Sequence, residues 1–371
     1  MTPDPATVPG PVQATAWIAA RLGRATDALE VGTVEIGLPG PNQVRVAVDT
    51  FSLDYNDIDT IYGRYGLLKF EPPFVPGMAA AGIVDAAGPG AEALLGRRVV
   101  GVAAGAQGGY ATAALLDAPS VQTLPSWLSF TDATAMYFPF LLGWLGLRSR
   151  GRLQAGETVL VHAGAGGVGS AVIQLAKVFG AVVIATAGSD EKVAFCRQLG
   201  ADYAVNYRTS DFVAYVDDVT NGHGVDLAFD TVGGQVTKDT YRTMAFNGRH
   251  LIVGYAADIA LEEQPVSMQP SIYGNFDLVG ICIAFVDDPR LTHSLGMNFL
   301  TRAQGIAMWD EILQLTQATR IRPVVGSEVA FEQAPLQLEA MERRETMGKS
   351  VVKTVGKGGG ATATSAPYTL A

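Results

Sequence analysis

Residues 159–169 read Val-Leu-Val-His-Ala-Gly-Ala-Gly-Gly-Val-Gly, and this stretch decides the fold. Its first residues form a continuous apolar run that predicts a buried strand, and apolar residues recur at helical spacing just after it. Between the two, Gly164, Gly166 and Gly169 match the pattern Gly-x-Gly-x-x-Gly. In this pattern the first glycine permits a tight turn, the second lets a pyrophosphate approach the backbone, and the third lets helix pack on strand. The stretch therefore predicts a dinucleotide site at the amino end of a helix.

The residues after this turn alternate between strand and helix patterns. Further buried strands are predicted at 182–185, 203–205, 226–229, 250–253 and 277–281. A second helix is predicted at 191–199, between the first two of them. Fully apolar strands that alternate with helices are typical of a parallel, doubly wound sheet. Residues 130–287 are therefore predicted to form one Rossmann domain.

The rest of the chain has a different rhythm. Residues 14–125 contain short strands separated by turn residues, with polar and apolar positions alternating at 43–48. A helix is predicted at 307–317, within a C-terminal segment too small to hold a core of its own. We therefore expect an α/β protein in which 13–129 and 288–355 together form a β-rich domain. Residues 1–12 are predicted to be a disordered N-terminus and 356–371 a flexible tail.

Composition excludes several classes of protein. The chain has 371 residues, of which 48% are hydrophobic and 17% charged, so a disordered body is excluded. The net charge of −10 argues against nucleic acid or an anionic membrane as partner. The longest apolar run, residues 136–147, is shorter than the roughly twenty residues a membrane span requires. Two isolated cysteines and the lack of a secretory pattern at the start favour a cytoplasmic protein.

The end of the second predicted strand bears on the choice of dinucleotide. It reads Ile-Ala-Thr-Ala at 184–187, without the acid that would bind the ribose 2′-hydroxyl of NAD. Ser189 is interpreted as a helix N-cap, with Asp190 and Glu191 in the first turn. Lys192 is either a solvated helix residue or a cation that reaches a 2′-phosphate. Asp190 leaves an alternative open, because it could turn back toward the ribose and favour NADH.

Several motifs carry a resemblance to a known family. The segment 159–207, with Gly-Ser-Asp-Glu-Lys at 188–192 and Asn-Tyr-Arg at 206–208, is similar to the zinc-free quinone oxidoreductase branch of the medium-chain dehydrogenase/reductase superfamily. Asn-Asp-Ile-Asp at 56–59, Gly-Arg-Tyr at 63–65 and Pro-Pro-Phe-Val-Pro-Gly at 72–77 resemble motifs of its first domain. Residues 342–352 resemble its closing segment.

The resemblance implies a GroES-like catalytic domain and a Rossmann domain with NADPH between them. It places Lys192, Tyr207 and Arg344 around the 2′-phosphate, and Asn56 and Tyr65 near the nicotinamide. The other cofactor-binding positions expected from it, besides the three glycines of the turn, are Gly167, Val168, Gly188, Ser189, Gly254 and Lys349. It also implies a homodimer joined through the Rossmann sheet, with residues 277–283 as the candidate edge strand.

The residues also allow plainer interpretations and depart from the family in places. Asn56 could form an Asx turn, Tyr65 could be a core aromatic, and a shortened loop leaves Tyr62 as an alternative to Tyr65. The stretches 51–56 and 77–79 lack the ligands of the zinc-dependent relatives, so no metal is expected. Ala79 replaces the glutamate often kept in the zinc-free branch, and Leu142 stands where a threonine is common. His162 and His250 are interpreted as buried core residues.

The expected activity is NADPH-dependent hydride transfer to a conjugated carbonyl, with a small quinone or enone as substrate. An enoyl-thioester reductase is the alternative within enzymes, because a CoA or carrier-protein substrate could use Arg64 and Lys69 at the mouth of the site. A non-catalytic NADPH-binding protein is the alternative from another class.

Overall fold

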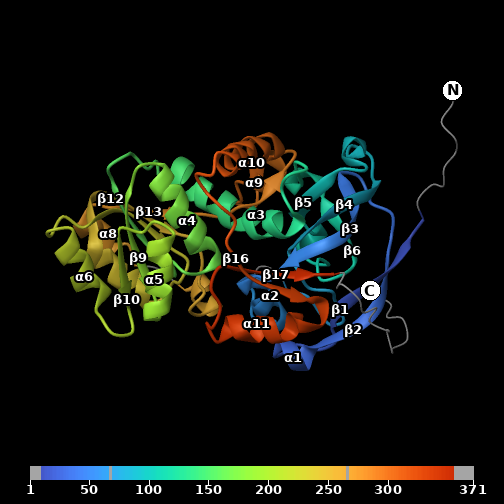
Figure 1. Ribbon diagram of the computed structural model, residues 1–371, viewed down its shortest axis with the longest axis horizontal. Coiled ribbons are helices and arrows are strands. Elements are labelled where there is room, and N and C mark those ends of the chain that lie inside the picture. Colours follow the sequence, from blue (N-terminus) through green and yellow to red (C-terminus); the bar gives the residue numbers. More distant parts are fainter. Residues whose placement is uncertain (1–9, 67–68, 265–266, 355–371) are drawn as a thin grey trace.

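The computed structural model describes residues 10–66, 69–264 and 267–354. Two sheets lie toward opposite ends of the molecule, and the helices α3 (Phe130–Trp144) and α10 (Arg302–Gln317) lie between them (Figure 1). Residues 1–9 of the predicted disordered N-terminus and the predicted tail at 356–371 lie outside the described residues. The first strand begins at Val12.

The parallel sheet has six strands. They are β8 (Thr158–Val161), β9 (Val182–Ala187), β10 (Tyr203–Asn206), β11 (Val225–Asp230), β12 (Met244–Ile252) and β13 (Asp277–Gly280). Their order is β10-β9-β8-β11-β12-β13, the arrangement of a Rossmann sheet. Val159 and Val161 pack into the core that contains α4 (Gly167–Val178), whereas Leu160 faces α6 (Phe212–Val219). Because both faces are covered, the residues of β8 from Val159 to Val161 form a continuous apolar run.

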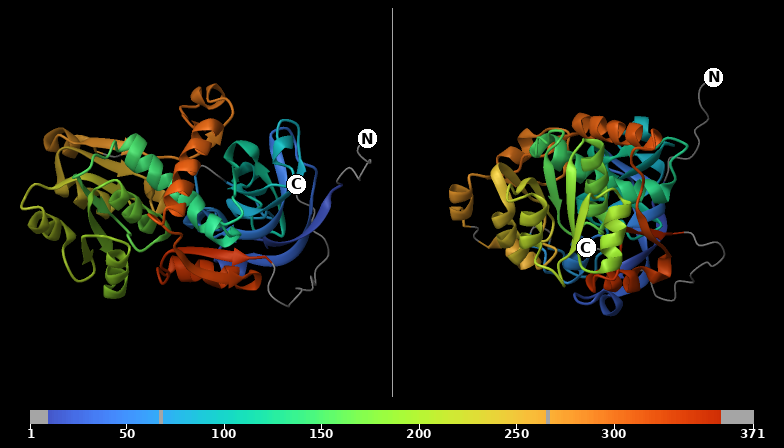
Figure 2. Two further views of the ribbon diagram at one scale, coloured as in Figure 1. Left: turned by 45° about the horizontal axis from the view of Figure 1, so that its top comes forward. Right: turned by 60° about the vertical axis from the view of Figure 1, so that its left-hand side comes forward.

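The second sheet has seven strands and draws on both ends of the chain. They are β3 (Gln43–Ser52), β4 (Ala79–Ala87), β5 (Arg98–Val102), β6 (Ala113–Asp117), β7 (Gln122–Thr123), β16 (Val325–Ala330) and β17 (Lys349–Lys353). β17 pairs antiparallel with β3, so the C-terminal segment returns to the first half of the chain as expected. Figure 2 shows these red C-terminal strands beside the blue N-terminal ones. β1 (Val12–Ala19) and β2 (Leu29–Ile36) form a separate antiparallel pair.

The remaining elements are short. The helices not yet given are α1 (Ala25–Ala28), α2 (Tyr55–Ile61), α5 (Asp190–Gln198), α7 (Gln235–Thr240), α8 (Gln269–Gly274), α9 (Arg290–His293) and α11 (Ala334–Glu342). β14 (Phe285–Val286) and β15 (Leu300–Thr301) form a small parallel pair. The fold class is thus the predicted one, a GroES-like domain joined to a Rossmann domain. The boundaries at 129/130 and 287/288 stay a prediction.

α3 explains the longest apolar run of the sequence. It packs on β3, β4 and β17 on one side and on α4 on the other, so most of its circumference is buried. A π-helical turn, η4 (Leu145–Arg150), continues it. Within the described ranges no helix is both long and apolar enough to cross a bilayer.

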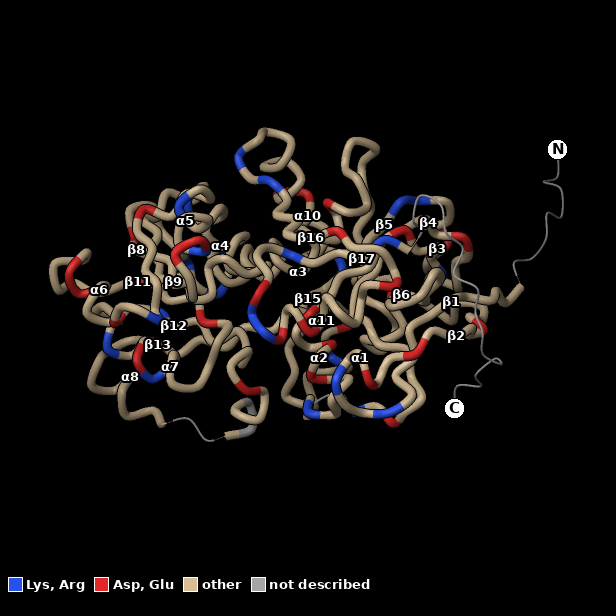
Figure 3. Tube along the Cα trace, turned by 60° about the horizontal axis from the view of Figure 1, so that its bottom comes forward, with Lys and Arg blue, Asp and Glu red and all other residues tan. Residues whose placement is uncertain are grey.

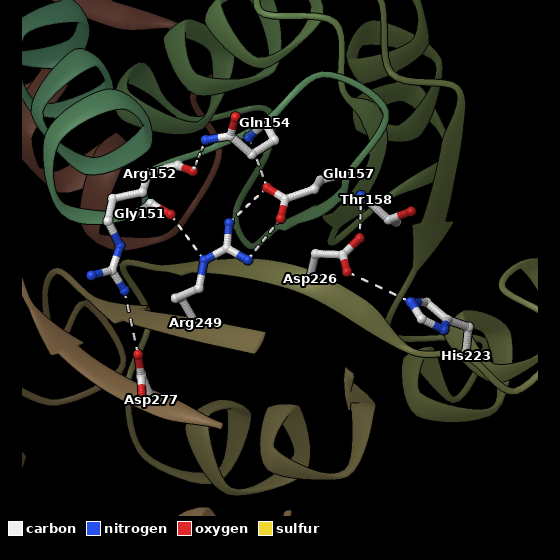
Figure 4. A network of polar contacts seen from close by, with 9 residues as sticks. All are labelled: Gly151, Arg152, Gln154, Glu157, Thr158, His223, Asp226, Arg249 and Asp277. Carbon is white, nitrogen blue, oxygen red and sulfur yellow. Dashed lines mark hydrogen bonds and ion pairs between the residues drawn. The ribbon is translucent and has the colours of Figure 1, made fainter. Parts of the chain in front are cut away.

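Charged residues are spread over the molecule rather than collected. Lys and Arg alternate with Asp and Glu along both domains in Figure 3. One ordered polar network closes the amino end of the parallel sheet, where Arg249 of β12 pairs with Glu157 just before β8 (Figure 4). This network lies at the end of the strands opposite to the glycine-rich turn, so it belongs to the scaffold and not to the site.

Candidate functional site

The glycine-rich turn joins β8 to the amino end of α4. A Cβ atom on Gly169 would lie 2.3 Å from the carbonyl oxygen of Ala163, and one on Gly164 would lie 3.0 Å from the Cys196 sulfur. Only glycine fits at these two positions without displacing backbone or packed core. A Cβ atom on Gly166, the N-cap of α4, would meet only the carbonyl oxygen of Ala163, at 3.3 Å. The turn is therefore tight on its inner side and open at Gly166, which suits the approach of an anion to a helix amino end.

The C-terminal segment crosses directly over this turn. The backbone N–H of Gly348 donates to the carbonyl oxygen of Ala165 over 2.8 Å. The next residue, Lys349, is buried, and its Cδ atom lies 3.2 Å from the position of a Cβ on Gly167. Its ammonium group is paired with the carboxylate of Asp54, which precedes α2. Gly167 and Lys349, 182 residues apart, thus lie side by side.

The pair of Asp54 and Lys349 brings the start of α2 to the turn. Asp54 and Asp57 form a capping box, in which the Asp57 carboxylate accepts from the Asp54 N–H over 2.9 Å. Asp57 also accepts from the Tyr110 hydroxyl at 2.8 Å and the Met78 N–H at 3.2 Å. Burial, together with the nearby Asp54 carboxylate, raises the pKa of Asp57 to about 7. Sequence reasoning missed both aspartates, although their Asp-x-x-Asp spacing is a capping signal.

Asn56 lies within α2, directly between the residues of this capping box. Asp54, and not Asn56, is the N-cap of this helix. The plainer interpretation, in which Asn56 forms an Asx turn at the start of the segment, therefore does not describe how the helix begins. Tyr65 follows the helix in a partly buried loop. The Tyr62 hydroxyl donates to the Glu342 carboxylate over 3.1 Å, and the Arg64 guanidinium lies 4.0 Å above its ring. Tyr62 is thus held against α11.

A second part of the site forms where β9 and β10 end. Ser189 caps α5 by accepting from the Lys192 N–H over 3.2 Å, as interpreted from the sequence. The Lys192 ammonium donates to the carbonyl oxygen of Arg344 over 2.6 Å. A Cβ on Gly188 would lie only 2.7 Å from the Tyr207 hydroxyl. The structure therefore brings Gly188, Ser189, Lys192, Tyr207 and Arg344 together from three distant segments.

Arg208 belongs to the same group of residues and was not singled out from the sequence. Its Nε atom lies 3.5 Å from the Cβ position of Gly188. The pKa of Lys192 is lowered by burial first and then by the guanidinium groups of Arg208 and Arg344, with Glu191 opposing the shift. Lys192, Arg208 and Arg344 thus place three positive charges close together, which favours binding of an anion. The signal available in the sequence was the position of Arg208 directly after Tyr207.

Gly254 follows β12 and lies against the turn after β11. Its carbonyl oxygen is 3.4 Å from the Cβ position of Gly233. The Asp230 carboxylate holds that turn, accepting from the N–H groups of Val232 at 2.8 Å and Gly233 at 3.1 Å. Burial opposes ionisation of Asp230, but the hydrogen bond from His250 and the charge of His162 outweigh it and lower its pKa.

The two histidines are buried, as interpreted from the sequence. His162 is hydrogen-bonded to the hydroxyls of Thr186 at 3.0 Å and Thr240 at 2.8 Å. His250 contacts Asp230 at 3.3 Å. In the ranges the structure describes, no group of three or more His, Cys, Asp or Glu side chains is arranged to hold a metal ion.

Comparisons with known proteins identify the family of both domains. Residues 40–126 match the alcohol dehydrogenase GroES-like domain and residues 167–292 the zinc-binding dehydrogenase family. The chain is 38% identical to a quinone oxidoreductase-like protein 2 homolog of Nematostella vectensis over 318 residues, which cover 85% of this chain and 82% of the relative. It is 33% identical over 310 residues, 81% of this chain, to a mycocerosic acid synthase-like polyketide synthase of Mycolicibacterium smegmatis, of which the match spans 14%.

Solved structures share the whole fold. A mycobacterial protein complexed with NADPH superposes with a TM-score of 0.79 at 26% identity, covering 92% of this chain and all of that one. A quinone oxidoreductase of Escherichia coli, also complexed with NADPH, superposes with a TM-score of 0.78 at 24% identity. At this level of identity the similarity shows only that the fold is shared. On the long match to the Nematostella relative and both domain matches, the chain belongs to the quinone oxidoreductase branch of the medium-chain dehydrogenase/reductase superfamily.

Proposed function

We propose that this protein is an NADPH-dependent reductase that transfers hydride to a conjugated carbonyl, with a small quinone or enone as acceptor. The observation that carries the proposal is the group of Lys192, Tyr207, Arg208 and Arg344 at the end of β9. A phosphomonoester carries nearly two negative charges at neutral pH and is stabilised by such a group of cations and hydroxyls. The NADPH complex of the mycobacterial relative supports the same cofactor.

The residues at both ends of the site fit this cofactor. Gly166 leaves space for a pyrophosphate beside Gly167 and Val168 at the amino end of α4, where no side chain caps the helix. Lys192, Tyr207 and Arg344 would hold the 2′-phosphate. Asp190, whose approach to the ribose would favour NADH, is instead bonded to Asn206 over 2.8 Å. This last contact argues for NADPH over NADH.

NADPH supplies the hydride when it is bound, and the protein positions the acceptor. We infer that Asn56 and Tyr65 donate hydrogen bonds to the acceptor oxygen, where negative charge develops. The capping box of Asp54 and Asp57 keeps the start of α2, and with it Asn56, in a fixed position beside Lys349. Tyr65 is the tyrosine that the resemblance to the family implies, whereas the Tyr62 hydroxyl is bonded to Glu342 on α11.

The residues that depart from the family favour an acceptor that needs no dedicated acid. Ala79 is buried at the start of β4, and Leu142 is half-buried in α3. Neither side chain can donate a proton. A quinone accepts hydride readily without one, so the apolar replacements are compatible with quinone reduction.

Enoyl-thioester reduction is the second candidate, and the match to a polyketide synthase favours it. The expected role of Arg64 in binding a CoA phosphate is weakened by its partners. Its guanidinium lies 3.1 Å from the Asp59 carboxylate and 3.7 Å from that of Glu342. Arg64 is therefore already neutralised at the mouth of the site.

One assay separates the candidate functions. The fall of NADPH absorbance is followed with a panel of quinones, enones and enoyl-CoAs, and NADPH binding is measured in parallel. Turnover of quinones or enones supports the proposal, and turnover of enoyl-CoAs alone supports the second candidate. Tight binding of NADPH without turnover would indicate a non-catalytic NADPH-binding protein.

The variant Asn56→Ala tests the role of the Asn56 side chain. It is expected to lower kcat by about 100-fold at unchanged NADPH affinity if the carboxamide of Asn56 stabilises the oxyanion.

We further propose that residues 13–129 and 288–355 form one domain and residues 130–287 form the other. We also propose that the protein is cytoplasmic and forms a homodimer. Ser129 caps α3, the helix that links the two sheets, which supports a boundary there. β13 is an edge strand of the parallel sheet, and the exposed Ile272 and Tyr273 lie just before it. An apolar edge of this kind is typical of pairing with a second chain.

A further inference from the structure

Asn206, the last residue of β10, connects two residues of opposite charge beside the proposed 2′-phosphate site. Its side-chain N–H donates to the Asp190 carboxylate over 2.8 Å. Its side-chain oxygen accepts from the backbone N–H of Arg208 over 3.1 Å. The two bonds use opposite ends of one carboxamide, so Asn206 fixes both neighbours at once.

The bond to Asp190 controls where the acidic charge lies. Asp190 and Lys192 are two residues apart in α5, so they project from nearly opposite sides of the helix. A carboxylate that turned back toward Lys192 would repel a phosphate and attract a ribose hydroxyl. Asn206 is half-buried and belongs to a strand, so it provides a rigid anchor that holds Asp190 away.

The bond to Arg208 controls where the basic charge lies. Asn206 forms an Asx turn, and its backbone carbonyl also accepts from the N–H groups of Thr209 at 3.2 Å and Ser210 at 3.0 Å. This turn carries Tyr207 and Arg208, the two side chains that cover Gly188. Loss of the contact with the Arg208 N–H would loosen the backbone turn from which the Arg208 side chain extends toward Gly188.

We propose that Asn206 is a positioning residue for cofactor selection, which holds Asp190 away from the ribose and holds Arg208 toward the 2′-phosphate. The inference rests on the proposed NADPH site and assigns the discrimination against NADH to a residue that contacts neither phosphate nor ribose. Arg208 then acts as a further phosphate-binding residue beside Lys192 and Arg344.

The test measures dissociation constants of NADPH and NADH for the full chain by the fluorescence of the bound nucleotide. Asn206→Ala is expected to weaken NADPH about 10-fold, whereas NADH should bind as tightly as before or more tightly, because the released Asp190 can reach the ribose. Asn206→Asp keeps the acceptor for Arg208 but places a second carboxylate against Asp190, so it should weaken NADPH as well. Thr209→Ala is the matched control, because it removes another side-chain bond of the same turn, and it should leave both constants unchanged.

A second variant separates positioning from a general loss of structure. If Asn206 acts by holding Asp190, the double variant Asn206→Ala/Asp190→Ala should recover a large part of the NADPH affinity. Absence of recovery, or an equal loss of both cofactors, would overturn the inference. The wild type tests the proposed function separately: equal affinity for NADPH and NADH there refutes the cofactor assignment. If the wild type prefers NADPH over NADH and Asn206→Ala keeps the same preference, only the role of Asn206 is refuted.

Discussion

Lys192 and Arg344, 152 residues apart in the sequence, are joined by a hydrogen bond of 2.6 Å from the Lys192 ammonium to the Arg344 carbonyl oxygen. Arg344 has a positive φ of 60°, so the backbone turns sharply there and presents its carbonyl to α5. The bond ties the C-terminal segment to the Rossmann domain beside Tyr207. The bond places two cations next to one another, and among the described residues no carboxylate forms an ion pair with the Lys192 ammonium or the Arg344 guanidinium.

Lys192→Ala should weaken NADPH about 10-fold and leave NADH almost unchanged. Charge-assisted hydrogen bonds contribute about 1.5–3 kcal/mol, and partial exposure places Lys192 toward the lower end. Titration of both proteins with both cofactors measures this. An equal loss of NADPH and NADH would contradict a contact specific to the 2′-phosphate.

His162→Gln should reduce the loss of stability in mild acid. Burial lowers the pKa of His162 from 6.5 to about 4, so between these values the unfolded chain binds a proton that the folded chain excludes. The free energy of unfolding therefore falls as the pH drops through this window, by up to roughly 1.4 kcal/mol per pH unit. Urea unfolding of both proteins near neutral pH and near pH 5 compares the slopes. Identical slopes would mean that His162 is protonated in the folded state.

Arg249→Ala should destabilise the fold without affecting cofactor binding. Arg249 is buried, makes bonds of 2.9 and 2.6 Å to Glu157, and donates to the Gly151 carbonyl oxygen (Figure 4). Removing it leaves Glu157 without its partner, at an expected cost of about 2–3 kcal/mol. Arg152→Ala is the control in the same network, because its contact with Asp277 is exposed and should contribute less than about 1 kcal/mol. Urea unfolding and an NADPH titration measure both effects, and a comparable loss from the two variants would show that burial of the pair is unimportant.

The protein should be a dimer at micromolar concentration, and Gly280→Pro should weaken it. The N–H of Ile281 donates to Ile252 in β12, so by strand alternation the N–H of Gly280 points away from β12. Proline there removes an outward donor and spares the internal ladder. Gly280 has no atom within 4 Å of its Cβ position, so the ring itself should be tolerated. Light scattering gives the mass of each protein, and a monomeric wild type would refute edge pairing.

Reductase activity should be unchanged by EDTA. The stretches 51–56 and 77–79 lack the ligands of the zinc-dependent relatives, and the carboxylate of Asp54 within the first stretch is paired with Lys349. The neighbouring Asp57 carboxylate is hydrogen-bonded to Tyr110. Turnover is compared before and after dialysis against the chelator. Loss of activity that added zinc restores would contradict the zinc-independent assignment.

The sequence alone determined the Rossmann sheet, because its signals are local. The turn at 164–169 and the apolar strands on either side follow from the sterics of glycine and from burial on both faces, and neither depends on distant residues. The N-cap at Ser189 was predictable for the same reason. β12 begins at Met244, six residues before the predicted start, since its first half mixes exposed and buried positions.

Only the tertiary structure decided how the two ends of the site are assembled. Lys349 meets Asp54 across 295 residues, and Asn206 meets Asp190 because β9 and β10 end side by side. No periodicity in the chain encodes such contacts, since they arise from where strands and the returning C-terminal segment place their ends. The capping box that positions α2 had a local signal, but the hydrogen bonds that Asp57 accepts from Tyr110 and Met78 come from residues that only the folded sheet brings to it.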